Sequence, residues 1–205
     1  MDKLRSINKW SIGIMGVVLG VMTILGIRFV TYVAPTSTHY HANFAVYVDG
    51  KQEQFDSNPL IYADVTECTE NVAMTPTERA HLHENIKDVV HVEDEAVTWG
   101  NFFQNIGWNV DYEYMSTPKS LLADTDTKKV SYILNGEVVS DISARVISDK
   151  DRLLVSYGTS TKDEINKQFA TVASTAEKYD IEKDPASCSG GHSDNSAKTR
   201  ISHLL

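Results

Sequence analysis

The chain opens with a short polar segment followed by a long apolar run. Residues 1–9 carry three basic side chains against one acidic side chain. The next stretch, WSIGIMGVVLGVMTILGI, contains no charged residue, and after Arg28 the chain stays largely apolar as far as Val33. Because a helix needs about 20 apolar residues to cross a bilayer, residues 10–33 are predicted to form a transmembrane helix that anchors the chain in membrane lipid.

The charges beside this helix predict its orientation, since basic flanking residues stay in the cytoplasm. We expect a single-pass protein of the cell membrane, with a cytoplasmic tail at residues 1–9 and an extracytoplasmic C-terminal domain. A cleaved signal peptide is the alternative, but the run is longer than a signal core and its one cleavage candidate directly precedes Pro35. An uncleaved anchor is therefore favoured. Gly16 and Gly20 form a GxxxG pair that can support a weak homodimer, although scattered glycines are the favoured interpretation.

Beyond a short linker, the hydrophobic pattern changes to a period of two. Such alternation is typical of a strand with one buried side and one exposed side. Asp49-Gly50 then predicts a hairpin turn, with a return strand at residues 51–55. The predicted buried side comprises Tyr40, Ala42, Phe44, Val46 and Val48, and the opposite side carries His39, His41, Asn43, Ala45 and Tyr47.

Further strands and short helices are predicted along the rest of the domain. Thr75-Pro-Thr-Glu78 has the pattern of a capping box at the start of a short helix. Thr98–Ile106 predicts a second short helix, which buries its two phenylalanines and ends before Gly107. Strands are predicted at residues 88–94, 129–134, 138–139 and 152–157, with a second hairpin turn at Asn135-Gly136.

This order of elements favours an α+β fold. Residues 36–158 are predicted to form a β-grasp-like domain, in which a mixed sheet holds one short helix. The stretch VSYILNGEVVSDISARVISDKDRLLVSYG resembles the second half of ubiquitin-like folds. A capping box at Thr161 opens a C-terminal amphipathic helix, predicted over residues 160–182. The polar, Ser- and Gly-rich residues 183–205 are predicted to be a flexible tail.

Composition and motifs narrow the range of functions. The formal net charge of the chain is −9, which disfavours nucleic-acid binding because that binding rests on Lys and Arg. No P-loop, HExxH, GxSxG or GxGxxG motif occurs, so no sequence motif supports a nucleotide-binding site or a hydrolase. An enzyme is therefore the less favoured class, and a binding protein is favoured.

Histidines provide the candidate chemistry. Five of the seven histidines lie between His39 and His91, as two HxH motifs followed by HVE. Imidazole is a preferred ligand for zinc and copper, and a carboxylate can complete the set. Solvated histidines are the alternative, but two HxH motifs and one HxE within about fifty residues favour a copper or zinc site. The candidate metal ligands are His39, His41, His81, His83, His91 and Glu93.

One part of this hypothesis depends on where a helix ends. If the helix that begins after Thr75 continued to residue 85, His81 and His83 would point about 200° apart. Either that helix ends before His81, or only one of the two histidines binds the metal.

The motifs HYHANFAVYVDGK, HLHENIKDVVHVE and TWGNFFQNIGW together resemble a family of membrane-anchored or exported histidine-motif proteins. That family is known from candidate-phyla bacteria such as Saccharibacteria and from some archaea. The resemblance covers His39 to Tyr157 and implies no particular activity. Two positions depart from the family pattern, since Glu84 stands where Asp is usual and no Gly precedes VVHVE. The positions that match are His39, His41, His81, His83, His91, Glu93, Gly100, Phe102 and Phe103.

Two alternatives to metal binding remain at this stage. The domain could be a scaffold for a protein partner in the envelope, with the helix at Thr161–Tyr179 as the contact. It could also be a thiol or disulfide protein that uses Cys68 and Cys188, its only cysteines. An oxidising compartment would permit a disulfide between them, but the absence of a CxxC motif disfavours redox catalysis.

Overall fold

The computed structural model describes residues 9–33, 38–55, 75–83, 86–181, 197–202 and 204. The chain divides into two compact units, one within residues 1–36 and 192–205 and the other within residues 37–191. Both cysteines lie outside the described residues, so their pairing stays a prediction. His192 and His203 also lie outside the described residues.

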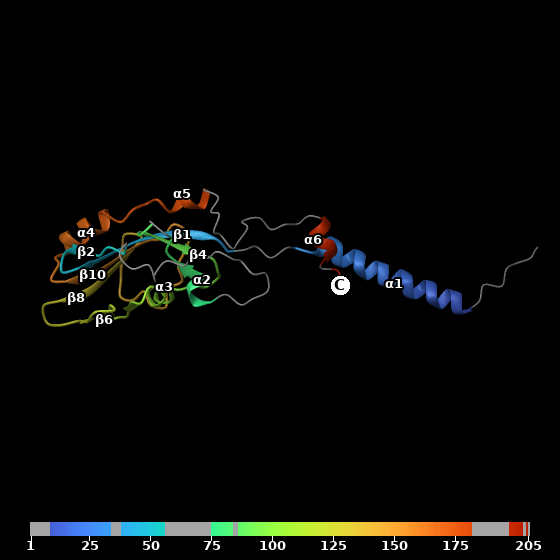
Figure 1. The fold of residues 1–205 in the computed structure, drawn as a ribbon, viewed down its shortest axis with the longest axis horizontal. Coiled ribbons are helices and arrows are strands. Elements are labelled where there is room, and N and C mark those ends of the chain that lie inside the picture. Colours follow the sequence, from blue (N-terminus) through green and yellow to red (C-terminus); the bar gives the residue numbers. More distant parts are fainter. Residues whose placement is uncertain are drawn as a thin grey trace, which may run out of the picture. The chain divides into compact units, whose positions relative to one another are not determined.

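The first unit contains the long apolar helix α1 (Lys9–Thr31), drawn in blue in Figure 1. Its segment Trp10–Thr31 has 22 residues and is the one helix of the described chain that is long and apolar enough to cross a membrane. A signal sequence near the N-terminus can also be long and apolar enough to meet this criterion. The apolar side chains of α1 are exposed, an arrangement that suits contact with lipid.

A short helix, α6 (Ala197–Ser202), belongs to the same unit and lies within the segment predicted to be a flexible tail. The Arg200 guanidinium donates to the carbonyl oxygens of Phe29 (2.9 Å) and Val30 (3.3 Å), near the end of α1. The last carbonyl groups of a helix receive no hydrogen bond from a following turn. The Arg200 side chain supplies the missing donor at this end of α1.

The second unit is built on a seven-stranded mixed sheet, as the α+β prediction requires (Figure 1). The strand order is β3-β4-β1-β10-β8-β9, and β2 also pairs with β1. A separate three-stranded sheet has the order β5-β6-β7. The strands are β1 (Tyr40–Val48), β2 (Lys51–Gln52), β3 (Ala80–His81), β4 (Val89–Val92), β5 (Asn109–Val110), β6 (Tyr114–Ser116), β7 (Leu121–Ala123), β8 (Lys129–Leu134), β9 (Glu137–Val139) and β10 (Arg152–Gly158).

The centre of the main sheet is a parallel pair formed by β1 and β10. Their register runs from Asn43 opposite Arg152 to Val48 opposite Tyr157. The other pairings of this sheet are antiparallel, including the β1–β2 and β8–β9 hairpins at the two predicted turns. Asn135 and Gly136 both have positive φ in the second turn, as a two-residue hairpin of this type requires.

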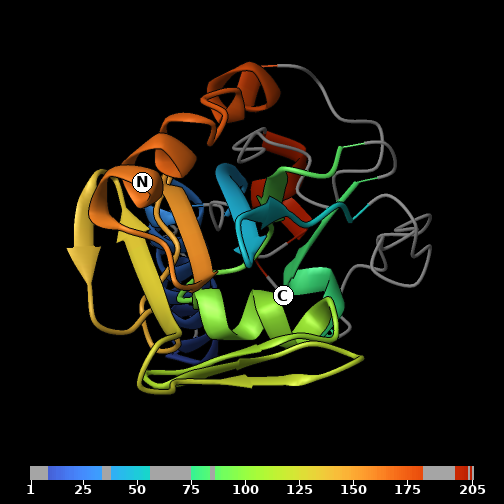
Figure 2. The same ribbon diagram turned by 90° about the vertical axis from the view of Figure 1, so that its left-hand side faces the viewer.

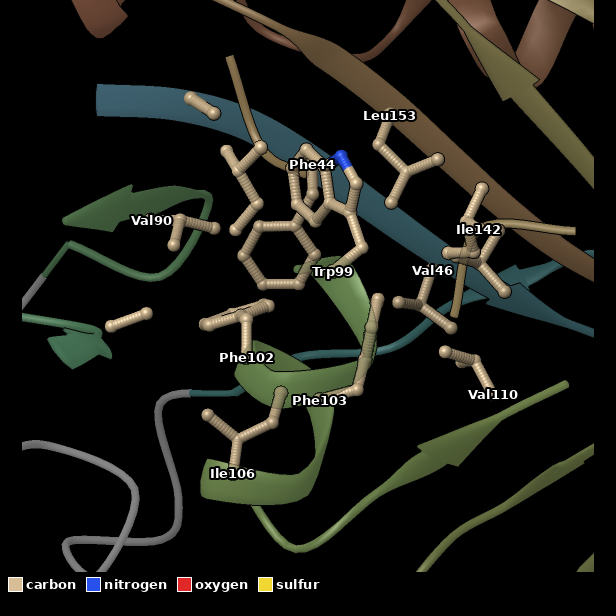
Figure 3. Close-up of a cluster of buried hydrophobic side chains, with 14 of the residues drawn as sticks. Phe44, Val46, Val90, Trp99, Phe102, Phe103, Ile106, Val110, Ile142 and Leu153 are labelled. Carbon is tan, nitrogen blue, oxygen red and sulfur yellow. The ribbon is translucent and has the colours of Figure 1, made fainter. Parts of the chain in front are cut away.

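One face of the sheet is covered by helix α3 (Trp99–Asn105), which confirms the helix predicted there. Phe102 lies against Phe44, Phe103 and Trp99, with ring centroids 5.0, 5.3 and 6.1 Å away (Figure 3). The predicted buried side of β1 faces this cluster. All four aromatic residues are at most 1% exposed. This cluster is the main hydrophobic core of the domain.

Thr98 begins α3 with a capping box that predicts a measurable stability effect. Its hydroxyl accepts from the Asn101 N–H at 3.1 Å, and its own N–H donates to the Asn101 side chain at 3.1 Å. We expect Thr98→Ala to lower the free energy of unfolding by about 1 kcal/mol, because an N–H of the first turn loses its acceptor. Thr98→Ser, which keeps the hydroxyl, is the control. Equal losses for the two variants in urea unfolding would contradict the role of this cap.

The opposite face of β1 is also covered, so the prediction of a half-exposed strand is wrong. Ala45 and Tyr47 pack with Ile133, Leu154 and Val172 in a second, smaller cluster. Helix α4 (Lys162–Ala170) lies over this cluster through Ile165 and Phe169. Figures 1 and 2 show α3 and α4 on opposite faces of the sheet.

The C-terminal helix predicted over residues 160–182 is interrupted. The structure has α4, which begins after the predicted capping box at Thr161, and a second helix, α5 (Ala176–Ile181). Between them the chain turns at Thr171, whose hydroxyl bonds to the Gln168 carbonyl at 2.7 Å. The break lets α5 lie beside β1 instead of continuing along the axis of α4.

Candidate metal centre

Three adjacent strands place the histidines next to one another. In the order β3-β4-β1, His81 of β3 pairs with His91 of β4, and His91 pairs in turn with His41 of β1. Paired residues of neighbouring strands point to the same face of a sheet. His91 therefore lies between a histidine on either side, and all three side chains are at most 3% exposed.

The two-residue spacing of the motifs adds three more candidate ligands. His39, His83 and Glu93 each lie two residues from one of these central histidines, so they share its face of the sheet. The arrangement requires that helix α2 (Pro76–Arg79) ends before His81, and Ala80 is indeed extended, with φ −154° and ψ 128°. The first of the two alternatives for this segment is therefore correct.

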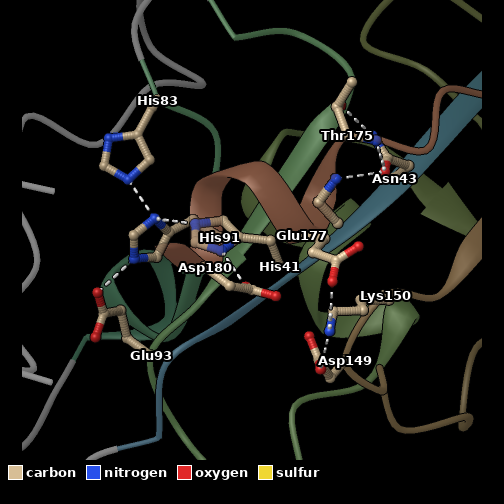
Figure 4. A network of polar contacts seen from close by, with 11 residues as sticks. His41, Asn43, His83, His91, Glu93, Asp149, Lys150, Thr175, Glu177 and Asp180 are labelled. Atoms are coloured by element: carbon tan, nitrogen blue, oxygen red, sulfur yellow. Dashed lines mark hydrogen bonds and ion pairs between the residues drawn. The ribbon is translucent and has the colours of Figure 1, made fainter. Parts of the chain in front are cut away.

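The ring nitrogens of these histidines meet around His91 (Figure 4). The Nδ1 atom of His91 lies 3.2 Å from Nε2 of His41 and 2.5 Å from Nε2 of His83. The His91 Nε2 atom lies 2.5 Å from a Glu93 carboxylate oxygen. The imidazole rings of His39 and His81 lie on either side, with centroids 4.6 and 5.0 Å from that of His91. All six predicted residues thus belong to one cluster.

Hydrogen-bond acceptors around the cluster determine which nitrogens carry protons. The Nδ1 atom of His81 lies 3.1 Å from the Thr77 carbonyl oxygen, which can only accept, so this nitrogen carries the proton. By the same reasoning the Glu93 carboxylate assigns the proton of His91 to Nε2. The remaining nitrogens, Nε2 of His81 and Nδ1 of His91, carry the lone pairs.

Asp180 of α5 fixes the position of the proton on His41. No sequence motif indicated this residue. A carboxylate oxygen of Asp180 lies 2.7 Å from Nδ1 of His41, which leaves the His41 lone pair on Nε2, toward His91. Acceptors that hold the outer nitrogen of a histidine in this way are a recurring feature of metal sites.

Helix α5 is held against β1 by Asn43, which explains how Asp180 reaches the site. The buried Asn43 side chain accepts from the backbone N–H groups of Thr175 and Ala176, both at 2.9 Å. It also donates to the Thr175 hydroxyl and to the Asp88 carbonyl oxygen, at 3.0 and 3.2 Å. An asparagine two residues after an HxH motif was the available sequence signal for this contact, because a polar residue inside an apolar strand needs partners.

Burial favours the neutral form of two histidines of the cluster, His41 and His81. Desolvation, together with the neighbouring His91 and His83, lowers the pKa of His81 from its ordinary 6.5 to about 3. Desolvation also lowers the pKa of His41, against the opposing effect of the hydrogen bond to Asp180. Near neutral pH both side chains are uncharged, the state in which imidazole binds a metal.

Several buried atoms of the cluster have no hydrogen-bond partner among the described residues. They are Nε2 of His39, Nε2 of His81 and Oε2 of Glu93. Leaving a buried polar atom unpaired costs about 1–3 kcal/mol, so atoms of this kind mark places where an ordered water, a ligand or an ion can bind. Two of the three are imidazole nitrogens of the type that binds copper and zinc.

The ligand atoms form two groups of metal-site size, each with its atoms within 4.8 Å of one another. The first group is His39, His41 and His91, and the second is His81, His83 and His91. Around a zinc ion, tetrahedral nitrogen ligands at 2.0–2.1 Å lie about 3.4 Å apart, so small side-chain movements would close either group around an ion.

Comparison of the chain with protein-family models, curated proteins and solved structures finds no match. The chemistry of the cluster is therefore inferred from its own residues.

Proposed function

We propose that the domain within residues 37–191 binds a transition metal, copper or zinc, through its histidine cluster. The observation that carries this proposal is the convergence of the lone pairs. His41 Nε2 and His91 Nδ1 lie 3.2 Å apart, and each of these rings has its proton on the other nitrogen. The Nε2 atom of His83 lies 2.5 Å from the same His91 nitrogen, so nitrogens of three histidines meet at one point, and Glu93 and Asp180 add negative charge nearby. A metal ion would find both nitrogen ligands and compensating charge there.

The chemistry of the cluster favours copper and zinc over other metals. The five imidazoles are borderline ligands, which suit zinc and copper, whereas calcium and magnesium prefer sites made of oxygen ligands. Glu93 and Asp180 place negative charge beside the imidazoles they hold, which strengthens these as ligands. Such a protein would store, deliver or sense the metal rather than catalyse a reaction.

We also propose that α1 is an uncleaved anchor with the metal-binding domain on the extracytoplasmic side of the cell membrane. The length and apolar character of Trp10–Thr31 support the anchor, and the basic residues before it support the orientation. Membership of the histidine-motif family and a β-grasp-like fold are proposed on the motifs from His39 to Tyr157 and on the parallel pairing of the first and last strands of the sheet.

Metal binding is tested on the full chain, purified without a tag in detergent and reconstituted with Zn²⁺ or with Cu²⁺. After gel filtration, mass spectrometry should find at least one equivalent of one of these metals. His91→Ala should weaken binding by more than about 100-fold, because a ligand common to both histidine groups is lost.

His203→Ala is the matched control, since this histidine lies outside the three strands that form the cluster. It should bind as the wild-type chain does. Less than about 0.1 equivalent of either metal on the wild-type chain would contradict the proposed function.

A further inference from the structure

The two histidine groups share a single residue, and this limits how they can be used. His39 and His41 come from the β1 side, His81 and His83 come from the β3 side, and His91 of the middle strand belongs to both groups. We infer that the two groups are alternative sites for one metal ion, because both of them need His91. This inference rests on the proposed function and adds to it the number of ions that the cluster can hold.

The decisive feature is that His91 has only one nitrogen available as a ligand. Its Nε2 atom is held by the Glu93 carboxylate at 2.5 Å, so the lone pair of the ring lies on Nδ1. That same Nδ1 atom faces both groups, at 3.2 Å from His41 Nε2 and 2.5 Å from His83 Nε2. One lone pair binds one ion at a time, so occupation of one group removes His91 from the other.

The two groups have the same pattern of burial. His39 and His83 are each partly exposed, whereas His41, His81 and His91 are buried. Each group therefore combines one partly exposed histidine with buried ones, and the buried His91 is the residue that the groups share.

Glu93 is in this arrangement a positioning residue rather than a ligand. Its carboxylate keeps the His91 proton on Nε2, and so keeps the lone pair on the side where the two groups meet. If the Nε2 atom of His91 were instead deprotonated and bound a second ion, the chain would hold two ions with His91 as a bridge. Stoichiometry distinguishes these two states.

The test uses the full chain in detergent, Zn²⁺ as the probe and competition with a chromophoric chelator to measure affinity. The wild-type chain should bind one zinc. His39→Ala and His83→Ala should each still bind one zinc, with affinity within about threefold of wild type, because one complete group remains in either variant. The double variant should lose more than about 100-fold, since both groups are then incomplete.

Each other outcome overturns the inference in a recognisable way. Two zinc ions on the wild-type chain would mean that both groups fill together. A loss of more than about 100-fold in one single variant would mean that the ion uses only one site. If the wild-type chain binds no zinc and no copper, it is the proposed function that fails. Where an alanine variant unfolds in urea more easily than the wild-type chain, His39→Gln and His83→Gln replace the alanine pair.

Discussion

Replacing Asn43 with leucine should lower the free energy of unfolding of the domain by about 2–4 kcal/mol. Leucine has the same branched arrangement of side-chain heavy atoms but no polar atom, so the buried N–H of Ala176 and the neighbouring N–H of Thr175 would lose the acceptor they share at 2.9 Å. Each backbone group left without a partner costs about 1–3 kcal/mol if it stays buried, and release of α5 into water would forgo its packing against β1.

Urea unfolding followed by tryptophan fluorescence measures the loss, and hydrogen exchange of residues 175–181 locates it. Asn166→Leu is the matched control, because Asn166 is exposed on α4 and the same change there should stay within about 0.5 kcal/mol. The substitution should also affect the metal centre, because Asp180, which holds His41, lies on α5. Unchanged exchange of residues 175–181 in Asn43→Leu would show that Asn43 does not hold this helix.

Replacing Gly100 with alanine should destabilise the domain by about 2–3 kcal/mol. A Cβ atom at this position would lie 2.4 Å from the Ser143 carbonyl oxygen, a backbone atom that cannot move without its strand connection. The Gly100 N–H also donates to this same oxygen at 3.1 Å. Overpacking of this kind usually costs about 1–3 kcal/mol. The variant would also distort the hydrogen bond from the residue 100 N–H to Ser143, which adds to the loss.

Gly16→Ala in α1 is the control for this substitution, because nothing lies within 4 Å of a Cβ atom there. It should leave the unfolding of the domain unchanged. The higher helix propensity of alanine, about 1 kcal/mol over glycine, would act only within α1. Urea unfolding again measures both variants. Equal stability of Gly100→Ala and the wild-type chain would mean that the contact between α3 and Ser143 is loose.

Local sequence patterns predicted most elements of the main sheet and its helices, because each pattern has a local cause, whereas the strands of the β5-β6-β7 sheet were not predicted. The alternation from Tyr40 to Val48 and the capping boxes at Thr75 and Thr161 correspond to elements in the structure. Hydrophobic period and capping chemistry act within a few residues, so they can be read without knowledge of the fold.

The exposure of the second face of β1 could not be predicted in the same way. His41 was expected on an open surface, but Val172 and α5, some 130 residues later in the chain, lie over that face. The pairing of β4 with β1, which places His91 beside His41, likewise joins segments about fifty residues apart. The six candidate ligands were therefore identified by residue type and spacing, whereas their convergence and the role of Asp180 required the structure.

The parallel pairing at the centre of the sheet has a consequence for how the domain comes into being. Hydrogen bonds from Asn43–Val48 to Arg152–Tyr157 join segments that are more than one hundred residues apart. Strands with such distant partners form slowly, because the chain between them must first be ordered. A growing chain that leaves a ribosome or a membrane pore N-terminus first can pair β1 with β2 and β4 before β10 emerges. The histidines can therefore come together before the sheet is complete, whereas Asp180, which follows β10 in the chain, can reach His41 only near the end of synthesis.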